Sequence, residues 1–249
     1  MSESQVYVVT GASKGLGRSI CDILATNGYT VIGLARSPTE LSSLENYLKK
    51  KNPKSTTFVC DLSSENQIAS TAAKMTNDFP IIHGLIHNAG IIGPVGSMFN
   101  VETNLWNETI QVNLLAVQQL TKLLYPSMVN AQRCRVTTIS SGAAVNSLES
   151  WSAYCTSKAG LEMWTRSLAD EGSRHGISAV SVAPGIVDTD MQATIRSVSV
   201  DDFPMVGRFI GFHNNGDLAA PGVVAKSLYE LITNHSMDDS GNRFDVREL

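Results

Sequence analysis

The chain has 249 residues, of which 43% are hydrophobic and 17% are charged, and its formal net charge is −4. This composition favours one α/β domain over residues 1–249, although two small domains would also fit the length. The acidic balance gives no general reason to expect binding to nucleic acid or to an anionic membrane surface, so we expect small-molecule ligands.

The cysteines and the N-terminal residues indicate the cellular location and the redox state of the thiols. Four cysteines, at 21, 60, 134 and 155, show neither a C-x-x-C pair nor histidines at zinc-ligand spacing, so neither disulfides nor a metal site is predicted. The start MSESQVYVVTGASKG lacks a basic segment followed by an apolar one, and no apolar run is long enough to span a bilayer. We therefore expect a soluble, cytoplasmic protein with reduced thiols.

Short β-branched runs alternate with amphipathic helical patterns along the chain. Strands are predicted at QVYVVT, YTVIGLA, STTFVC, IIHGLIH, RVTTIS, ISAVSVA and NRFDV, and helices at 16–27, 40–50, 65–77, 105–130 and 151–175. Strands that are apolar on consecutive positions are covered on both faces. The order predicts a Rossmann-type, doubly wound, seven-stranded parallel sheet with helices on both faces. The segment 191–217 has no clear period and is interpreted as a mobile flap or a short-helix insertion.

A glycine cluster, TGASKGLGRSI, directly follows the first predicted strand. Glycines at Gly11, Gly15 and Gly17 allow a tight turn and let a pyrophosphate approach the backbone N–H groups at the start of a helix. The cluster would also fit an ordinary strand-to-helix turn, but its place after the first strand favours a dinucleotide cradle.

The spacing G-x-x-x-G-x-G is the form found in short-chain dehydrogenases/reductases, and the chain resembles that family over nearly its whole length. The family's motifs recur in the family's order, as TGASKGLG, Asp61-Leu62, NAG at 88–90, Asn113, Ser141, Y-x-x-x-K at 154–158, and Pro184-Gly185 with Thr189. The resemblance implies carbonyl reduction, in which a reduced nicotinamide cofactor delivers hydride to a carbonyl carbon.

The end of the second predicted strand bears on the choice of cofactor. Where an NAD enzyme would place an acid, this chain has GLARS, with Ala35 followed by Arg36. In the family, an arginine here together with Lys14 goes with NADP(H), although both cations would also fit a solvated surface. The resemblance implies cofactor contacts at Gly11, Ser13, Lys14, Gly15, Leu16, Gly17, Arg36, Asp61, Leu62, Asn88, Ala89, Gly90, Tyr154, Lys158, Pro184, Gly185, Ile186, Val187 and Thr189.

The stretch SWSAYCTSK places Tyr154 one helical turn before Lys158. A free phenol has a pKa of about 10, and a neighbouring ammonium and a positive nicotinamide ring would lower it, which would make Tyr154 a usable acid. Taken alone, the pair would equally fit the solvent-exposed face of an amphipathic helix. The resemblance implies that Ser141 donates a hydrogen bond to the substrate oxygen and that Asn113 anchors a water in a proton relay. Asn113 alone would read as an accommodated polar residue.

Within the family, WSAYCTSKAGLEM and APGIVDTDMQ resemble fungal benzil reductase-like and sepiapterin reductase-like enzymes, which act on vicinal diketones or on a pterin with a diketone side chain. The ending SGNRFDV implies a substrate contact at Asp245, which could equally be a surface residue of the last strand. Trp151 and Met191, with Phe203 and Phe209, would either shape an apolar pocket or belong to the core.

Two other functions fit the same motifs. The chain could bind NADP(H) as a catalytically silent sensor, or oxidise an alcohol in the reverse direction. The family resemblance also implies that the long helices at 105–130 and 151–175 pair across a two-fold axis, so we expect a homodimer or homotetramer. A light-scattering mass equal to the 26.8 kDa of one chain would contradict this expectation.

Overall fold

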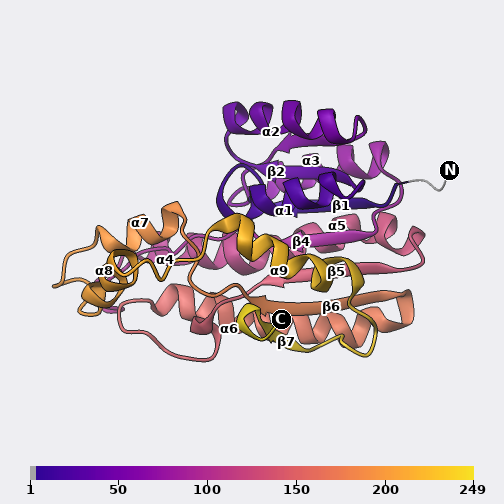
Figure 1. The fold of residues 1–249 in the computed structure, drawn as a ribbon. Helices are drawn as coiled ribbons and strands as arrows, with labels where there is room; N and C mark the ends of the chain where they lie inside the picture. The colour runs from indigo at the N-terminus through magenta and orange to yellow at the C-terminus, as the bar shows by residue number, and fades with distance from the viewer. Residues whose placement is uncertain (1–3) are drawn as a thin grey trace.

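Seven parallel strands form a single sheet in the computed structural model, which describes residues 4–249 (Figure 1). The strands are β1 (Val6–Thr10), β2 (Thr30–Ala35), β3 (Thr56–Val59), β4 (Gly84–His87), β5 (Cys134–Ile139), β6 (Ile177–Ala183) and β7 (Arg243–Asp245). Their order across the sheet is β3-β2-β1-β4-β5-β6-β7, and every neighbouring pair is parallel. The sequence prediction of a doubly wound seven-stranded sheet is confirmed. Because the order reverses between β1 and β4, a crevice is expected there at the carboxyl ends of the strands.

The central strands are buried on both faces. Every residue of β2, β5 and β6 is buried, which explains why apolar and β-branched residues occupy consecutive positions in these strands rather than alternating with polar ones. Most strand boundaries lie within one residue of the prediction, but β4 begins only at Gly84, where its pairing with β1 and β5 starts. Residues 81–83 of the predicted strand therefore lie before it.

Six helices cover the two faces of the sheet (Figure 1). One face packs against α1 (Gly15–Thr26), α2 (Pro38–Lys51) and α9 (Pro221–Asn234). The other packs against α3 (Glu65–Asp78), α5 (Ala116–Asn130) and α6 (Ser152–Gly172). The sequence prediction omitted α9, although Pro221 at its start and the buried Val224, Leu228 and Leu231 carry a helical signal.

The helical stretch predicted at 105–130 is not one regular helix. It consists of α4 (Thr103–Ile110), a π-helical turn over Gln111–Leu115, and α5. The π-helical turn contains the buried Asn113. Turns of this kind insert one extra residue into a helix and often occur at functional sites.

The segment 191–217 forms two short helices beyond the carboxyl ends of the strands, at the left of Figure 1. These are α7 (Asp190–Arg196) and α8 (Val206–Asn214). Phe203 and Phe209 are buried in a cluster with Trp151. Of the two interpretations made from sequence, the segment has the architecture of a short-helix insertion.

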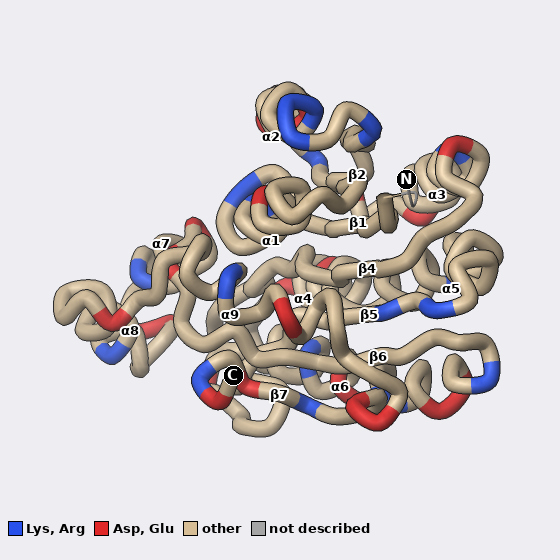
Figure 2. Tube along the Cα trace, turned by 45° about the vertical axis from the view of Figure 1, so that its right-hand side comes forward, with Lys and Arg blue, Asp and Glu red and all other residues tan. Residues whose placement is uncertain are grey.

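Charged residues of both signs are distributed along the chain, as Figure 2 shows. Lys49, Lys50 and Lys51 lie in the last turn of α2, where their positive charges interact favourably with the negative end of the helix dipole.

Between residues 4 and 249, no helix combines the length and the apolar character that crossing a bilayer requires.

The packing around Gly84 provides a test of the fold. A Cβ atom at Gly84 would lie 2.2 Å from two ring atoms of Tyr7, which is fully buried. We expect Gly84→Ala to lower the free energy of unfolding by about 1–3 kcal/mol through overpacking. Gly222→Ala is the matched control, because nothing lies within 4 Å of its added Cβ, and it should be neutral or slightly stabilising. Urea unfolding of the two variants measures the difference, and equal midpoints would contradict this packing.

Candidate active site

A cleft of about 1590 Å³ runs along the carboxyl ends of the strands. Its volume exceeds the 300–1,000 Å³ of ordinary small-ligand pockets, so it has room for a dinucleotide together with a substrate. All the residues predicted from sequence to bind cofactor or substrate line this cleft, and so do Ser141, Tyr154 and Lys158. Asn113 does not line it and lies behind the wall.

The glycine loop between β1 and α1 leaves no room for side chains. Gly11 has a φ of +66°, which favours glycine. A Cβ atom at Gly17 would lie 2.2 Å from the Gly11 carbonyl oxygen and 2.4 Å from Asn88 Nδ2. No side chain caps the start of α1, so its first N–H groups can bind an anion at the positive end of the helix. The loop therefore fits a pyrophosphate.

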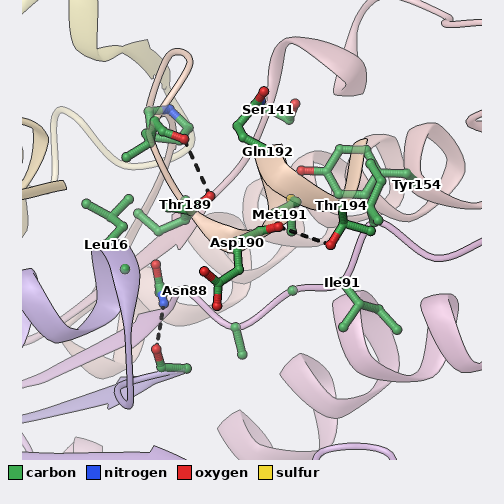
Figure 3. Close-up of a pocket in the computed structure, with 18 of the residues that line it drawn as sticks. Leu16, Asn88, Ile91, Ser141, Tyr154, Thr189, Asp190, Met191, Gln192 and Thr194 are labelled. Atoms are coloured by element: carbon green, nitrogen blue, oxygen red, sulfur yellow. Dashed lines mark hydrogen bonds between the residues drawn. The ribbon is translucent and has the colours of Figure 1, made fainter. Parts of the chain in front are cut away.

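The NAG segment after β4 is held against this loop by side-chain hydrogen bonds. Asn88 Nδ2 donates to the Thr10 carbonyl at 2.9 Å, and the backbone N–H groups of Asn88 and Ala89 both donate to Thr10 Oγ1 at 3.0 Å. Figure 3 shows Asn88 and Leu16 on one side of the cleft, across from Ser141 and Tyr154. The segment at 88–90 therefore forms a wall of the cleft that hydrogen bonds hold to the end of β1, and the sequence analysis missed the part that Thr10 plays in these bonds.

The two cations predicted to select the cofactor differ in their contacts. Arg36 is exposed at the end of β2 and lines the cleft. Lys14 Nζ lies 2.6 Å from Asp190 Oδ2 at the start of α7, and both side chains are largely exposed. Because exposed ion pairs contribute little free energy, Lys14 can exchange this partner for another anion. Asp61, also in the cleft, accepts hydrogen bonds from the Ser63 backbone and hydroxyl.

The Ser141, Tyr154 and Lys158 side chains meet where α6 packs on the end of β5. Tyr154 is 7% exposed and Lys158 is 3% exposed. Lys158 Nζ donates to the Ile139 carbonyl at 2.8 Å and lies 5.7 Å from the centre of the Tyr154 ring. Ser141 Oγ accepts from the Ala143 backbone N–H at 3.1 Å, which begins the short turn at 142–144. A phenol, a hydroxyl and an ammonium thus border one end of the cleft.

Burial changes the acidity of both titratable groups. Burial raises the pKa of Tyr154 to about 12, and hydrogen bonding with Ser141 opposes this rise. Burial lowers the pKa of Lys158 to about 8, and the charge of Glu162 opposes this fall. Lys158 and the positive nicotinamide ring together were expected to lower the Tyr154 pKa. In the protein alone burial raises it, and the Lys158 ammonium donates to the Ile139 carbonyl. The lowering in the presence of cofactor stays a prediction.

Asn113 is fully engaged within the protein. Its Nδ2 donates to the Ile91 carbonyl at 2.9 Å and to Ser157 Oγ at 3.0 Å, and its Oδ1 accepts from the Ile91 N–H at 2.9 Å. A Cβ atom at Gly90 would lie 3.4 Å from Asn113 Oδ1 and 3.5 Å from Lys158 Nζ, so Asn113 and Lys158 border the same glycine. Asn113 joins the wall of the cleft to α6, and its predicted role in a proton relay stays a prediction.

The far end of the cleft is apolar and aromatic. The centre of the Trp151 ring lies 5.4 Å from that of Phe203 and 5.3 Å from that of Phe209, and Met191 packs against this cluster.

Asp245, the predicted polar contact of the substrate, is paired with Arg247. Both carboxylate oxygens of Asp245 accept from Arg247, at 2.7 and 2.6 Å, and the pKa of Asp245 falls to about 2 mainly because of this contact. A substrate that bonded to Asp245 would therefore have to compete with Arg247.

Sequence reasoning also missed Glu162, which lies one turn beyond Lys158 on α6 and is 5% exposed. The i, i+4 spacing from Lys158 was the available signal. Over residues 4–249, no three or more histidine, cysteine or acidic side chains are grouped so as to hold a metal ion.

Comparison with known proteins places the chain in a family. The short chain dehydrogenase family model matches residues 5–199. The chain is 32% identical over 248 residues to benzil reductase ((S)-benzoin forming) of Bacillus subtilis, with 98% of this chain and 99% of the relative covered. The crystal structure of the KRED1-Pglu enzyme is similar with a TM-score of 0.88 and 33% identity, covering 96% of this chain and 100% of that one.

A variant of actinorhodin polyketide ketoreductase, in a structure with NADPH, has a TM-score of 0.85 and 26% identity, covering 99% of this chain and 97% of that one. The resemblance stated from the sequence motifs is confirmed by the family model and by the relatives. The protein is thus an oxidoreductase, and the chain belongs to the short-chain dehydrogenase family.

Proposed function

We propose that this protein is an NADPH-dependent carbonyl reductase that transfers hydride to a ketone or vicinal diketone, with Tyr154 as the general acid. The observation that carries the proposal is that Ser141, Tyr154 and Lys158 line the same cleft as the glycine loop. A site of this kind brings together a hydrogen-bond donor, an acid and a nicotinamide-binding surface, which are the parts that carbonyl reduction needs.

The cofactor supplies the hydride when it is bound. Tyr154 gives its proton to the substrate oxygen, while the Ser141 hydroxyl donates a hydrogen bond to that oxygen as negative charge develops. Lys158 holds the nicotinamide ribose, and Asn113 completes the path of the proton to solvent. The free Tyr154 pKa of about 12 is too high for efficient proton exchange, so positive charge beside the phenol is required to lower it.

The cofactor would lie along the edge of a single domain formed by residues 1–249. The glycine loop would hold the pyrophosphate, and Arg36 and Lys14 would hold the 2′-phosphate, with Asp61 and Leu62 beside the adenine. The remaining wall would be formed by Asn88, Ala89, Gly90, Pro184, Gly185, Ile186, Val187 and Thr189, all of which line the cleft. The NADPH in the related ketoreductase structure supports this choice of cofactor.

The substrate is proposed to be an apolar or aromatic dicarbonyl. The aromatic end of the cleft, with Trp151 and Met191, supports an apolar substrate, and two Bacillus relatives named benzil reductase support a vicinal diketone. Asp245, which is buried, lines the cleft and is held by Arg247, would contact a polar end of the substrate.

The oligomeric state and the cellular location are also proposals. Leu115, Tyr125 and Met163 leave apolar side chains exposed in the π-helical turn, α5 and α6, which supports pairing of these helices in a homodimer or homotetramer. The four unpaired cysteines support a reducing, cytoplasmic location.

A catalytically silent sensor is disfavoured, because all four predicted catalytic residues are present and three of them line the cleft. Oxidation of an alcohol by the same residues is the alternative that remains.

Tyr154→Phe tests the reaction. The variant lacks the acidic proton, so we expect kcat for NADPH-dependent reduction of benzil, other diketones, sepiapterin and simple ketones to fall by about 10²–10⁴-fold. NADPH binding, measured by fluorescence, should change little. An unchanged rate would remove Tyr154 from the proposal. Wild-type protein that binds NADPH but reduces no carbonyl of the panel would instead favour the sensor.

Arg36→Ala tests the cofactor. We expect kcat/KM for NADPH to fall about tenfold or more, because a hydrogen bond to a charged group contributes about 1.5–3 kcal/mol. The value for NADH should stay within about twofold, since NADH has no 2′-phosphate to contact. Arg133→Ala, an exposed arginine just before β5 and outside the cleft, is the matched control. A wild-type preference for NADH, or equal losses with both cofactors, would contradict the assignment.

A further inference from the structure

Glu162 is a buried carboxylate behind the candidate catalytic residues, and the proposed reaction does not use it. Its oxygens accept hydrogen bonds from the Ser140 hydroxyl and, at 2.5 Å, from the Ser181 hydroxyl. The Arg243 Nε atom lies 3.2 Å from Glu162 Oε1. These three partners come from the end of β5, from β6 and from β7. Glu162 therefore connects α6 to three strands at the edge where the cleft lies.

A buried carboxylate costs free energy unless hydrogen bonds and an opposite charge compensate it. Ser140, Ser181 and Arg243 provide this compensation. An apolar side chain at this position would fill the same space without that cost, as in the cores elsewhere along α6. The presence of a charge here consequently calls for a role other than stability.

Glu162 is connected to the candidate catalytic residues in two ways, the first through its hydrogen bond with Ser140. Ser140 stands between Ile139, whose carbonyl accepts from Lys158, and Ser141. A hydrogen bond to Ser140 therefore restrains the backbone on both sides. The second connection is electrostatic, since the Glu162 charge raises the pKa of Lys158 while burial lowers it.

The surroundings of Lys158 contain few other charges. On α6 it is faced by the neutral phenol of Tyr154 and by Glu162. The neighbouring elements present the Ile139 carbonyl, Gly90 and the uncharged amide of Asn113. Arg243 faces the far side of Glu162. Among the described residues, Glu162 is thus the one carboxylate whose charge acts on Lys158.

We propose that Glu162 is a positioning residue for carbonyl reduction, which holds the Ser140–Ser141 backbone in place and keeps the Lys158 ammonium charged near neutral pH. The inference rests on the proposed function, because it takes Ser141 and Lys158 as the groups that act. Glu162 itself touches neither substrate nor cofactor.

The sign of the pH effect follows from the charge. Lys158 must be protonated to act, and its pKa of about 8 places its deprotonation on the alkaline side of neutrality. Glu162→Gln removes the opposing charge, so the Lys158 pKa should fall below about 8. Each unit of that fall removes about tenfold of the protonated form at high pH. The alkaline limb of kcat/KM should therefore move to lower pH.

The experiment compares the pH profiles of Glu162→Gln and Glu171→Gln. Glu171 is an exposed glutamate on the same helix, so its variant should keep the wild-type profile. A second pair of variants, Ser140→Ala and Ser181→Ala, separates the positioning of the Ser140–Ser141 backbone from the electrostatic effect on Lys158. Ser140→Ala should lower kcat without moving the alkaline limb. Ser181→Ala removes a hydrogen bond from the other oxygen of the same carboxylate and should lower kcat less. If Glu162→Gln does not fold, Glu162→Asp keeps the charge with a shorter reach, and should lower kcat while leaving the limb in place.

NMR measures the Lys158 pKa directly and needs no catalytic turnover. The ¹³Cε signals of the lysines are followed as the pH is raised, and the Lys158 signal is identified as the one that is missing in Lys158→Arg. A lower Lys158 pKa in Glu162→Gln, and an unchanged one in Glu171→Gln, supports the inference even if no carbonyl tested is reduced, in which case only the proposed function fails. An unchanged Lys158 pKa together with an unmoved alkaline limb would overturn it, as would equal effects of the two serine variants.

Discussion

The hydrogen bond from the buried Lys158 ammonium to the Ile139 carbonyl is the contact on which the site depends. It joins α6 to the carboxyl end of β5, and so brings Tyr154, on the helix, beside Ser141, which follows the strand. A buried ammonium is tolerated only where acceptors surround it and a negative charge compensates it. The Ile139 carbonyl supplies the acceptor, and Glu162, one turn further along α6, supplies the charge.

The parallel sheet explains why so many separate segments meet in one cleft. In a parallel sheet every strand ends at the same edge, so the loops that follow β1 to β6 converge there. The glycine loop can approach closely because Gly11 and Gly17 carry no side chains. The aromatic cluster around Trp151 then covers the end of this edge and forms an apolar compartment beside the proposed acid.

Much of the fold was predictable, because strands covered on both faces carry continuous apolar runs and the helices between them have a strong period. The errors have local causes. The helix at 221–234 was omitted although Pro221 and its apolar spacing indicate it. The irregular stretch at 191–217 gave no period, since its apolar residues pack on Trp151 from two short helices and a loop. The π-helical turn at Asn113 was not visible in sequence, because one extra residue in a helix leaves no local composition signal.

By itself, the sequence determined the parallel architecture, the glycine cradle and the spacing of Tyr154 and Lys158, since each of these follows from local periodicity and from motifs over a few residues. Only the tertiary structure decided the electrostatics. How far a pKa shifts depends on how deeply the fold buries the group and on which groups it brings from distant parts of the chain, such as Ile139, Glu162 and Arg243 around the end of β5. For Tyr154, the pair spacing indicated proximity to Lys158 but not the burial of the phenol, which raises its pKa in the protein alone.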